Sequence, residues 1–181
     1  MRVISGTARG KQLLPVPGMK TRPTTDRVKE SIFNIIQMRC RGARVLDLFA
    51  GTGQLGIEAL SRGATHADFV DMDKSARAII EKNLRGTRVE DRAKVYGGDF
   101  TAFLAQAKPH SYDIIFLDPP YGGRLLQNAL HAIERFDILS ADGIIICESA
   151  VEDKWETGFS HGKEYRYGGI LITLLHPAEE T

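Results

Sequence analysis

The residues with the clearest chemical meaning in this sequence are Asp118-Pro119-Pro120-Tyr121, which follow the apolar stretch Ile114 to Leu117. A proline ring fixes φ and removes the backbone N–H, and the residue before each proline is driven into an extended conformation. The turn is therefore stiff and rich in acceptors. It suits the exocyclic amino group of a nucleobase, because the Asp118 carboxylate and the Pro119 carbonyl can accept its two N–H bonds while Tyr121 stacks on the base. We take these four residues as catalytic candidates, with an ordinary turn as the alternative.

A glycine-rich turn occurs earlier, in the stretch Val45-Leu46-Asp47-Leu48-Phe49-Ala50-Gly51-Thr52-Gly53-Gln54-Leu55-Gly56. The order strand, tight turn, helix start would let a ligand approach the bare backbone at the end of the strand. The spacing also fits the dinucleotide fingerprint G-x-G-x-x-G, or a turn that serves packing alone. The position of Asp47 favours another ligand, since a carboxylate there repels a pyrophosphate but can hold a cationic amino-acid group. S-adenosylmethionine has that group and no phosphate, so the candidate cofactor-binding residues are Asp47, Phe49, Gly51 and Gly53.

Two further strand ends carry acidic residues. Asp71, followed by Met72, lies twenty residues after Gly51, where a carboxylate can accept both hydroxyls of a ribose. Asp73 is expected to cap the next helix. Asp99 can accept from an adenine amino group while Phe100 packs on the ring, or Asp99 can simply cap a helix. The remaining cofactor-binding candidates from the motifs are Asp71, Met72, Asp99 and Phe100.

Other catalytic chemistries have little support in the sequence. Neither of the two cysteines, Cys40 and Cys147, follows a proline as a nucleophile for carbon methylation would, and they form no CxxC spacing or disulfide framework. The five histidines show no HExxH spacing, and no GxxxxGK[ST] loop occurs. We therefore expect no metal, and we expect Cys147 to be a buried core residue.

The elements that must position these residues alternate between apolar strands and amphipathic helices from residue 44 onward. This alternation indicates βαβ units and a parallel sheet covered on both faces. Only Gly168 and Gly169 separate the last two strands, so these should form an antiparallel hairpin. Strands are predicted at Arg44 to Phe49, Ala67 to Asp71, Ala93 to Tyr96, Tyr112 to Leu117, Gly143 to Glu148, Lys163 to Tyr167 and Ile170 to His176. Helices are predicted at Gln54 to Arg62, Lys74 to Leu84, Thr101 to Ala107 and Arg124 to Phe136, with a weaker one near Asp153.

The amino-terminal part of the chain is basic. Residues 1–44 hold ten basic and two acidic residues, a net charge of +8, whereas the remainder holds 14 and 21, a net charge of −7. This asymmetry is typical of a nucleic-acid-binding face, with a solvated basic surface as the alternative. Short strands at Arg2 to Gly6 and Lys11 to Val16 predict a basic β-hairpin extension over residues 1–20, joined to a domain over residues 21–181. A helix is predicted at Thr24 to Met38, capped by Thr24 or Thr25.

Length and composition fit a single globular domain. The 181 residues are 43% hydrophobic and 26% charged, which excludes collagen-like, coiled-coil and wholly disordered chains. The longest apolar runs, such as Ile144 to Cys147 and Ile170 to Leu175, are the size of strands, so no membrane-spanning helix is expected. No secretory signal is visible at the amino terminus, and the sparse cysteines favour a reducing cytoplasm.

Nearly every segment of the chain resembles the bacterial RsmD group of 16S ribosomal RNA guanine-N2 methyltransferases. The resemblance rests on Arg2 to Lys11, Thr21 to Asn34, the glycine turn after Asp47, Glu58 to Ala64 and Asp118 to Tyr121. It implies a Rossmann-like α/β fold of the class I S-adenosylmethionine-dependent methyltransferases, with a seven-stranded, mostly parallel sheet and an antiparallel carboxyl-terminal hairpin. It further implies that the segment with Arg22 and Thr24 lies against the cofactor and that the basic hairpin binds ribosomal RNA. The candidate RNA-binding residues are Arg2, Arg9, Lys11 and Lys20. Thr52 departs from the pattern, since similar sequences often carry serine there.

The expected function is transfer of a methyl group from S-adenosylmethionine to the N2 amino group of a guanine in 16S ribosomal RNA. The expected substrate is an assembling small ribosomal subunit. The chain is small enough to act as a monomer. One alternative is a DNA methyltransferase acting on adenine N6 or cytosine N4, because Asp-Pro-Pro-Tyr does not distinguish these amino groups. An NAD-dependent oxidoreductase would leave Asp118 to Tyr121 unexplained. A non-enzymatic RNA-binding module would not need acidic residues at the strand ends.

Overall fold

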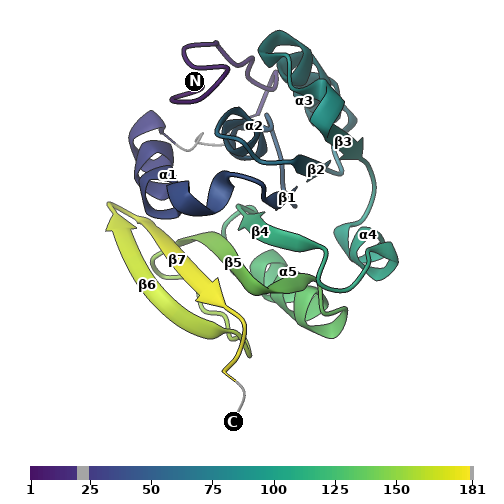
Figure 1. The fold of residues 1–181 in the computed structure, drawn as a ribbon. Helices are drawn as coiled ribbons and strands as arrows, with labels where there is room; N and C mark the ends of the chain where they lie inside the picture. The colour runs from purple at the N-terminus through teal and green to yellow at the C-terminus, as the bar shows by residue number, and fades with distance from the viewer. Residues whose placement is uncertain (20–24, 180–181) are drawn as a thin grey trace.

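The computed structural model describes residues 1–19 and 25–179, and within them one sheet has the strand order β3-β2-β1-β4-β5-β7-β6 (Figure 1). Strands β1 to β5 are paired in parallel, whereas β7 is antiparallel to both β5 and β6. The strands are β1 (Arg44–Asp47), β2 (His66–Val70), β3 (Ala93–Tyr96), β4 (Tyr112–Leu117), β5 (Leu139–Ala150), β6 (Ser160–Tyr167) and β7 (Ile170–His176). The helices are α1 (Asp26–Cys40), α2 (Gln54–Ser61), α3 (Lys74–Thr87), the short 3₁₀ helix η1 (Glu90–Arg92), α4 (Phe100–Gln106) and α5 (Arg124–Arg135).

Both faces of the sheet are buried, as the nearly continuous apolar runs predict. Successive residues of a strand point to opposite faces, and the central strands accordingly contribute to two hydrophobic clusters. Phe116 packs in the cluster formed with α1, α2 and α3, whereas its neighbours Ile115 and Leu117 pack in the cluster with α4 and α5. Figure 1 shows α4 and α5 away from α1 and α2, with the sheet between them. The seven predicted strands are confirmed in order and direction.

Local capping signals are also confirmed. Helix α1 begins at Asp26, and Thr25, one of the two predicted caps, accepts a hydrogen bond from the Val28 N–H at 3.3 Å. Asp73 caps α3 by accepting from the Ser75 N–H at 2.8 Å. The carboxyl-terminal hairpin turns at Gly168 and Gly169, and the adjacent Tyr167 and Ile170 are paired.

The helix predicted near Asp153 is wrong, because residues 151–159 form turns and irregular structure. Side chains satisfy the backbone groups that a helix would have used. Gln127 of α5 accepts from the Glu156 N–H at 2.7 Å and donates to the Glu156 carbonyl at 2.5 Å. The Asp153 carboxylate accepts from the Ala150 N–H at 3.0 Å. This segment is therefore held as an ordered strap across the start of α5.

The amino-terminal hairpin is shorter than predicted. Its two segments pair in antiparallel fashion only at the bridge between Arg2 and Gln12, flanked by hydrogen bonds such as the Val3 N–H to the Lys11 carbonyl at 2.9 Å. The strands predicted at Arg2 to Gly6 and Lys11 to Val16 are not formed over those lengths. The backbone after Val3 instead turns toward α2 and bonds to its side chains.

A buried charge cluster holds this amino-terminal segment to the core. Glu58 and Lys29 are both fully buried, and Lys29 Nζ lies 3.7 Å from Glu58 and donates to the Arg2 carbonyl. Glu58 also accepts from the Ile4 and Ser5 N–H groups at 2.9 and 3.0 Å and from Arg62 Nε at 2.9 Å. Burial lowers the pKa of Lys29, and Glu58 opposes that shift. The division of the chain at residue 20 stays a prediction, since that residue lies outside the described ranges.

Within the described part of the chain, every helix is too short or too polar to cross a membrane.

Candidate active site

The carboxyl ends of β1, β2 and β4 lie side by side, because these strands are parallel neighbours in the sheet. Asp47, the last residue of β1, is in register with Phe69 of β2 and Phe116 of β4. The glycine turn, Asp71 and the Asp118–Tyr121 corner follow these positions, so they meet at one edge of the sheet. That edge is where open α/β sheets bind their ligands.

Asp47 is a buried carboxylate at the centre of this edge. It is 1% exposed and accepts a hydrogen bond from the Gly56 N–H at 3.2 Å. Burial raises the pKa of Asp47 to about 7, the Asp71 charge adds to the rise, and the Gly56 hydrogen bond opposes it. Burial penalises the ionised form of the Asp47 carboxyl group, and a cation bound nearby would stabilise that ionised form. The position fits a ligand with a cationic group, as the sequence predicts.

The glycines of the turn have two different roles. Gly51 and Gly53 have φ angles of 56° and 80°, in the left-handed region that side chains rarely adopt. A Cβ added to Gly51 would meet no other atom within 4 Å, so the backbone there is open to a ligand. A Cβ on Gly56 would lie 2.4 Å from the Phe69 ring. The third glycine therefore serves the close packing of α2 on β2.

Asp71 organises the turn after β2. Its Oδ2 accepts from the Gly51 N–H at 2.8 Å, and its Oδ1 accepts from the Asp73 N–H at 2.9 Å. Arg77 donates to the carbonyls of Asp71 and Met72 at 2.9 and 2.8 Å. Met72 is 72% exposed beside this carboxylate. The ribose role of Asp71 stays a prediction, which its place at the strand end supports.

Asp99 caps α4 by accepting from the Thr101 and Ala102 N–H groups at 2.6 and 3.3 Å. Phe100 is buried and packs edge to face on Phe49, with ring centroids 5.2 Å apart. The structure thus gives Asp99 the capping role that the sequence left open. Contact of either residue with an adenine ring stays a prediction.

The Asp118–Tyr121 corner follows β4 directly and leads into α5. Pro119 is buried, Asp118 is half-buried, and Tyr121 is 50% exposed. The Tyr121 hydroxyl donates to Glu148 Oε1 at 3.2 Å. Gly122 and Gly123 have positive φ angles, and Gly123 is the residue before α5. Asp118 and Tyr121 thus follow β4 at the same edge of the sheet at which the glycine turn follows β1.

The amino-terminal segment lies against the glycine turn through Asn83 of α3. This buried amide donates to the Thr52 carbonyl at 2.9 Å and is paired with the Leu14 backbone, whose N–H it accepts at 2.8 Å. The Thr52 hydroxyl also donates to Met1 Sδ at 3.4 Å. No spacing pattern in the sequence points to these contacts.

Three of the predicted RNA-binding residues, Arg2, Arg9 and Lys11, are exposed on this segment. Arg2 Nε lies 3.5 Å from the Asp26 carboxylate, in an exposed ion pair. The other predicted residues of this region, Lys20, Arg22 and Thr24, lie outside the described residues. Met1 and Leu14 of this segment reach the glycine turn, whereas Thr7 and Ala8 bond to Ser61 at the far end of α2.

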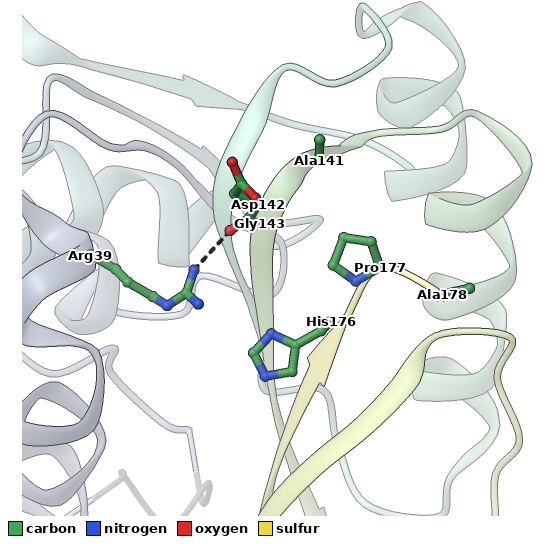
Figure 2. Close-up of a pocket in the computed structure, with 7 residues that line it drawn as sticks. All are labelled: Arg39, Ala141, Asp142, Gly143, His176, Pro177 and Ala178. Carbon is green, nitrogen blue, oxygen red and sulfur yellow. Dashed lines mark hydrogen bonds between the residues drawn. The ribbon is translucent and has the colours of Figure 1, made fainter. Parts of the chain in front are cut away.

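The pocket in Figure 2 lies apart from the candidate site. It has a volume of about 300 Å³ and is formed where β5 starts and β7 ends, with Arg39 Nη1 donating to the Asp142 carbonyl at 2.7 Å. None of the described residues that line it is a predicted site residue. Among residues 1–19 and 25–179, no group of three or more His, Cys, Asp and Glu side chains is arranged to hold a metal ion.

Comparison with known proteins places the chain in a family. A family model described as Conserved hypothetical protein 95 matches residues 1–176. The chain belongs to this family. Ribosomal RNA small subunit methyltransferase D of Escherichia coli (strain K12) is 40% identical over 154 residues, which cover 84% of this chain and 76% of that protein.

Solved structures agree with the fold of this member of the Conserved hypothetical protein 95 family. The Escherichia coli protein yhhF superposes with a TM-score of 0.86 at 37% identity, covering 99% of both chains. An RNA methyltransferase from Salinibacter ruber, solved with S-adenosyl-L-homocysteine, shares the fold with a TM-score of 0.68 at 16% identity, covering 88% of this chain and 97% of that one. The predicted class I methyltransferase fold and the resemblance to the RsmD group are confirmed.

Replacing Asp47 with asparagine is expected to change how stability depends on pH. The pKa of Asp47 is about 7 in the folded protein, whereas an unperturbed aspartate has a pKa of 3.8. Between these two pH values the folded protein holds a proton that the unfolded chain has released, so stability falls as the pH rises from the lower to the higher value. The stability gained by Asp47→Asn should therefore grow by about 2–3 kcal/mol between pH 5 and pH 8. Urea unfolding of both proteins at the two pH values measures it. An equal difference at both would show that Asp47 does not titrate in this way.

Proposed function

We propose that this protein transfers a methyl group from S-adenosylmethionine to the N2 amino group of a guanine in 16S ribosomal RNA. The observation that carries the proposal is the meeting, at one sheet edge, of the buried Asp47 beside the glycine turn and the Asp118–Tyr121 corner. The first suits a cationic cofactor, and the second suits the amino group of a base. A donor of methyl groups and its acceptor would thus be held next to each other.

The cofactor half of the proposal assigns a role to each strand end. Asp47 holds the cationic amino-acid group, the open backbone at Gly51 admits the cofactor, and Asp71 accepts from the ribose hydroxyls. Met72 and Phe49 offer apolar surface to the adenine. When bound, S-adenosylmethionine supplies an activated methyl group on a positively charged sulfur. The Salinibacter ruber relative in fold supports this cofactor class, since it was solved with the demethylated product.

The corner supplies what a guanine amino group lacks. The N2 nitrogen of guanine is a poor nucleophile, because its lone pair is delocalised into the ring. Asp118 and the Pro119 carbonyl accept its two N–H bonds, which opposes delocalisation and directs the lone pair outward. Such positioning is worth several kcal/mol of barrier. The nitrogen gains one methyl group and releases one proton, to Asp118 or to water.

The choice of 16S ribosomal RNA rests on the resemblance stated above and on the Escherichia coli relative, which is named as a small-subunit ribosomal RNA methyltransferase. The guanine N2 position rests on the resemblance alone. The exposed basic residues Arg2, Arg9 and Lys11 of the amino-terminal segment favour RNA over a small-molecule substrate. An NAD-dependent oxidoreductase is disfavoured by Asp47, which would face the pyrophosphate.

Nucleoside analysis by mass spectrometry tests the proposal. Small-subunit RNA from cells lacking this protein should lose one N2-methylguanosine, which the wild-type gene restores. Labelled S-adenosylmethionine with naked RNA, assembling subunits or DNA then identifies the acceptor in vitro. Retention of the modified guanosine in the deletion strain, or label found only in DNA adenine or cytosine, would contradict the proposal.

Asp71→Ala should weaken binding of S-adenosylmethionine at least about tenfold, because the variant loses both the ribose acceptor and the hydrogen bond to the Gly51 N–H. Isothermal titration calorimetry measures the affinity. Asp68→Ala, on the same strand but away from its carboxyl end, serves as the control. Unchanged affinity in the Asp71 variant would remove this residue from the cofactor site.

Replacing Arg9 and Lys11 together with alanine should lower RNA affinity and flatten its salt dependence. Each lost phosphate contact reduces the slope of log K against log salt by about 0.7–0.9. Filter binding at salt concentrations from about 50 to about 200 mM measures this slope. Lys163 and Arg166 on β6 provide a control pair of equal charge, also exposed. A slope equal to that of the wild type would mean that the segment does not contact phosphates.

We also propose that the protein works in the cytoplasm, as a monomer on an assembling small subunit, with residues 1–20 as the RNA-binding extension of a domain over 21–181. The two cysteines, both buried and unpaired, suit a reducing compartment.

A further inference from the structure

The outer half of the Asp118–Tyr121 corner is held to the end of β5 by two carboxylates that the proposed reaction does not use. Glu148 accepts from the Tyr121 hydroxyl at 3.2 Å. Asp153 accepts from the Gly122 N–H at 3.1 Å and, through its other oxygen, from the Ala150 N–H at 3.0 Å. The corner is thus tied to the neighbouring strand at two successive residues.

Glu148 is placed beside the corner by strand register. Leu117, the last residue of β4, pairs with Cys147 of β5, so Glu148 on β5 lies next to the start of the corner at Asp118. Glu148 is only 5% exposed. Burying a carboxylate costs several kcal/mol unless hydrogen bonds compensate, so a glutamate here needs a reason beyond packing.

The Tyr121 hydroxyl supplies one of the hydrogen bonds that compensate for the burial of Glu148. Half of the surface of Tyr121 is exposed, and an exposed tyrosine ring ordinarily samples several rotamers. The hydroxyl bonded to the buried Glu148 ties the far end of the ring, while the proline pair fixes the backbone at its near end. The ring is therefore held at both ends over the site edge.

The glycine turn after Tyr121 leaves little freedom for the corner to move. A Cβ on Gly123 would lie 2.9 Å from the Lys154 carbonyl, so this turn packs directly on the strap that contains Asp153. The strap itself is bonded to Gln127 of α5. The corner, the strap and the end of β5 thus form one connected unit.

We propose that Glu148 is a positioning residue for methyl transfer, which orients the Tyr121 ring so that it presents one fixed face to the target base. Asp153 supports the same unit by fixing the turn at Gly122. The inference rests on the proposed function, because it assigns to Tyr121 the stacking role described above. It adds a residue on β5 that acts through the tyrosine and does not itself contact the reacting atoms.

A double-mutant cycle between Tyr121 and Glu148 tests this proposal. Glu148→Leu removes the acceptor, Tyr121→Phe removes the donor but keeps the ring, and each should lower kcat/KM for RNA about tenfold, as expected for a lost hydrogen bond to a charged group. The double variant should be no worse than either single variant. Glu148→Gln should recover most of the activity, since its amide oxygen accepts the same hydroxyl. Affinity for S-adenosylmethionine should stay unchanged in all four proteins.

A second measurement does not depend on activity. NMR relaxation of a ring-labelled Tyr121 should show an ordered ring in the wild type and in Glu148→Gln, and a mobile ring in Glu148→Leu. Glu152→Leu, an exposed glutamate nearby, is the matched control and should change neither readout. An ordered ring in Glu148→Leu, multiplicative losses in the double variant, or a Gln variant as impaired as the Leu variant would each overturn the proposal. Wild-type inactivity on every RNA, with the ring responding as expected, would count against the proposed function and not against the positioning contact.

Discussion

Asp118→Ala is expected to lower kcat for methyl transfer by about two to four orders of magnitude, the range typical of a lost catalytic or transition-state hydrogen-bonding group. In the proposed reaction the Asp118 carboxylate accepts one of the two amino N–H bonds, and an alanine side chain has no acceptor to take its place. Affinity for S-adenosylmethionine should change by less than about threefold, because the glycine turn and Asp71 are untouched. Single-turnover methylation of RNA and calorimetric titration of the cofactor measure the two quantities.

Asp91→Ala, which removes an exposed carboxylate from η1, is the control and should match the wild type in both assays. Asp118→Asn keeps one acceptor oxygen and should fall between the wild type and the alanine variant. Wild-type turnover in Asp118→Ala would remove the corner from the reaction. A large loss of cofactor affinity with unchanged single-turnover rate would assign Asp118 to cofactor binding.

Glu58→Ala should reduce the free energy of unfolding by about 3–5 kcal/mol, as expected when one member of a buried ion network is removed. Lys29 and Arg62 would lose their shared carboxylate, and the N–H groups of Ile4 and Ser5 would lose their acceptors. Urea unfolding measures the loss. Amide hydrogen exchange at Ile4 and Ser5 should accelerate at the same time, because these N–H groups would no longer be bonded to α2.

Glu81→Ala, on the exposed side of α3, is the matched control and should change stability by less than about 0.5 kcal/mol. A loss below about 1 kcal/mol in Glu58→Ala would show that the cluster contributes little net stability. Fast exchange at Ile4 and Ser5 in the wild type itself would show that the amino-terminal segment is not held to α2.

Much of the fold could be predicted because its signals are local. The sequences of β1, β4 and β5 contain consecutive apolar residues, whereas a strand with one exposed face alternates apolar and polar residues. This pattern predicts that both faces of the sheet are buried. Thr25 and Asp73 are short polar side chains at helix starts, where an unpaired backbone N–H needs an acceptor. The helix near Asp153 failed for the opposite reason, since Gln127, distant in sequence, satisfies the backbone of Glu156.

The site followed from topology once the strands were known. Residues that end parallel strands lie at one edge, so Asp47, Asp71 and Asp118 could be grouped without coordinates. The burial and the hydrogen-bond partners of these residues could not be predicted in that way. Burial raises the pKa of Asp47 through atoms contributed by several elements, and Asp99 proved to cap α4, a choice that the sequence left open.

By itself, the sequence determined the order of the elements, the parallel sheet with its final hairpin, and the strand ends at which the candidate site residues lie, because each depends on residues within one turn or strand of one another. Only the tertiary structure decided that Glu58 holds the first residues to α2 and that Glu148 and Asp153 brace the corner from β5 and its strap. Those contacts join residues 27 to 54 positions apart. Hydrogen bonds across such separations depend on how whole elements pack, and no spacing pattern along the chain encodes them.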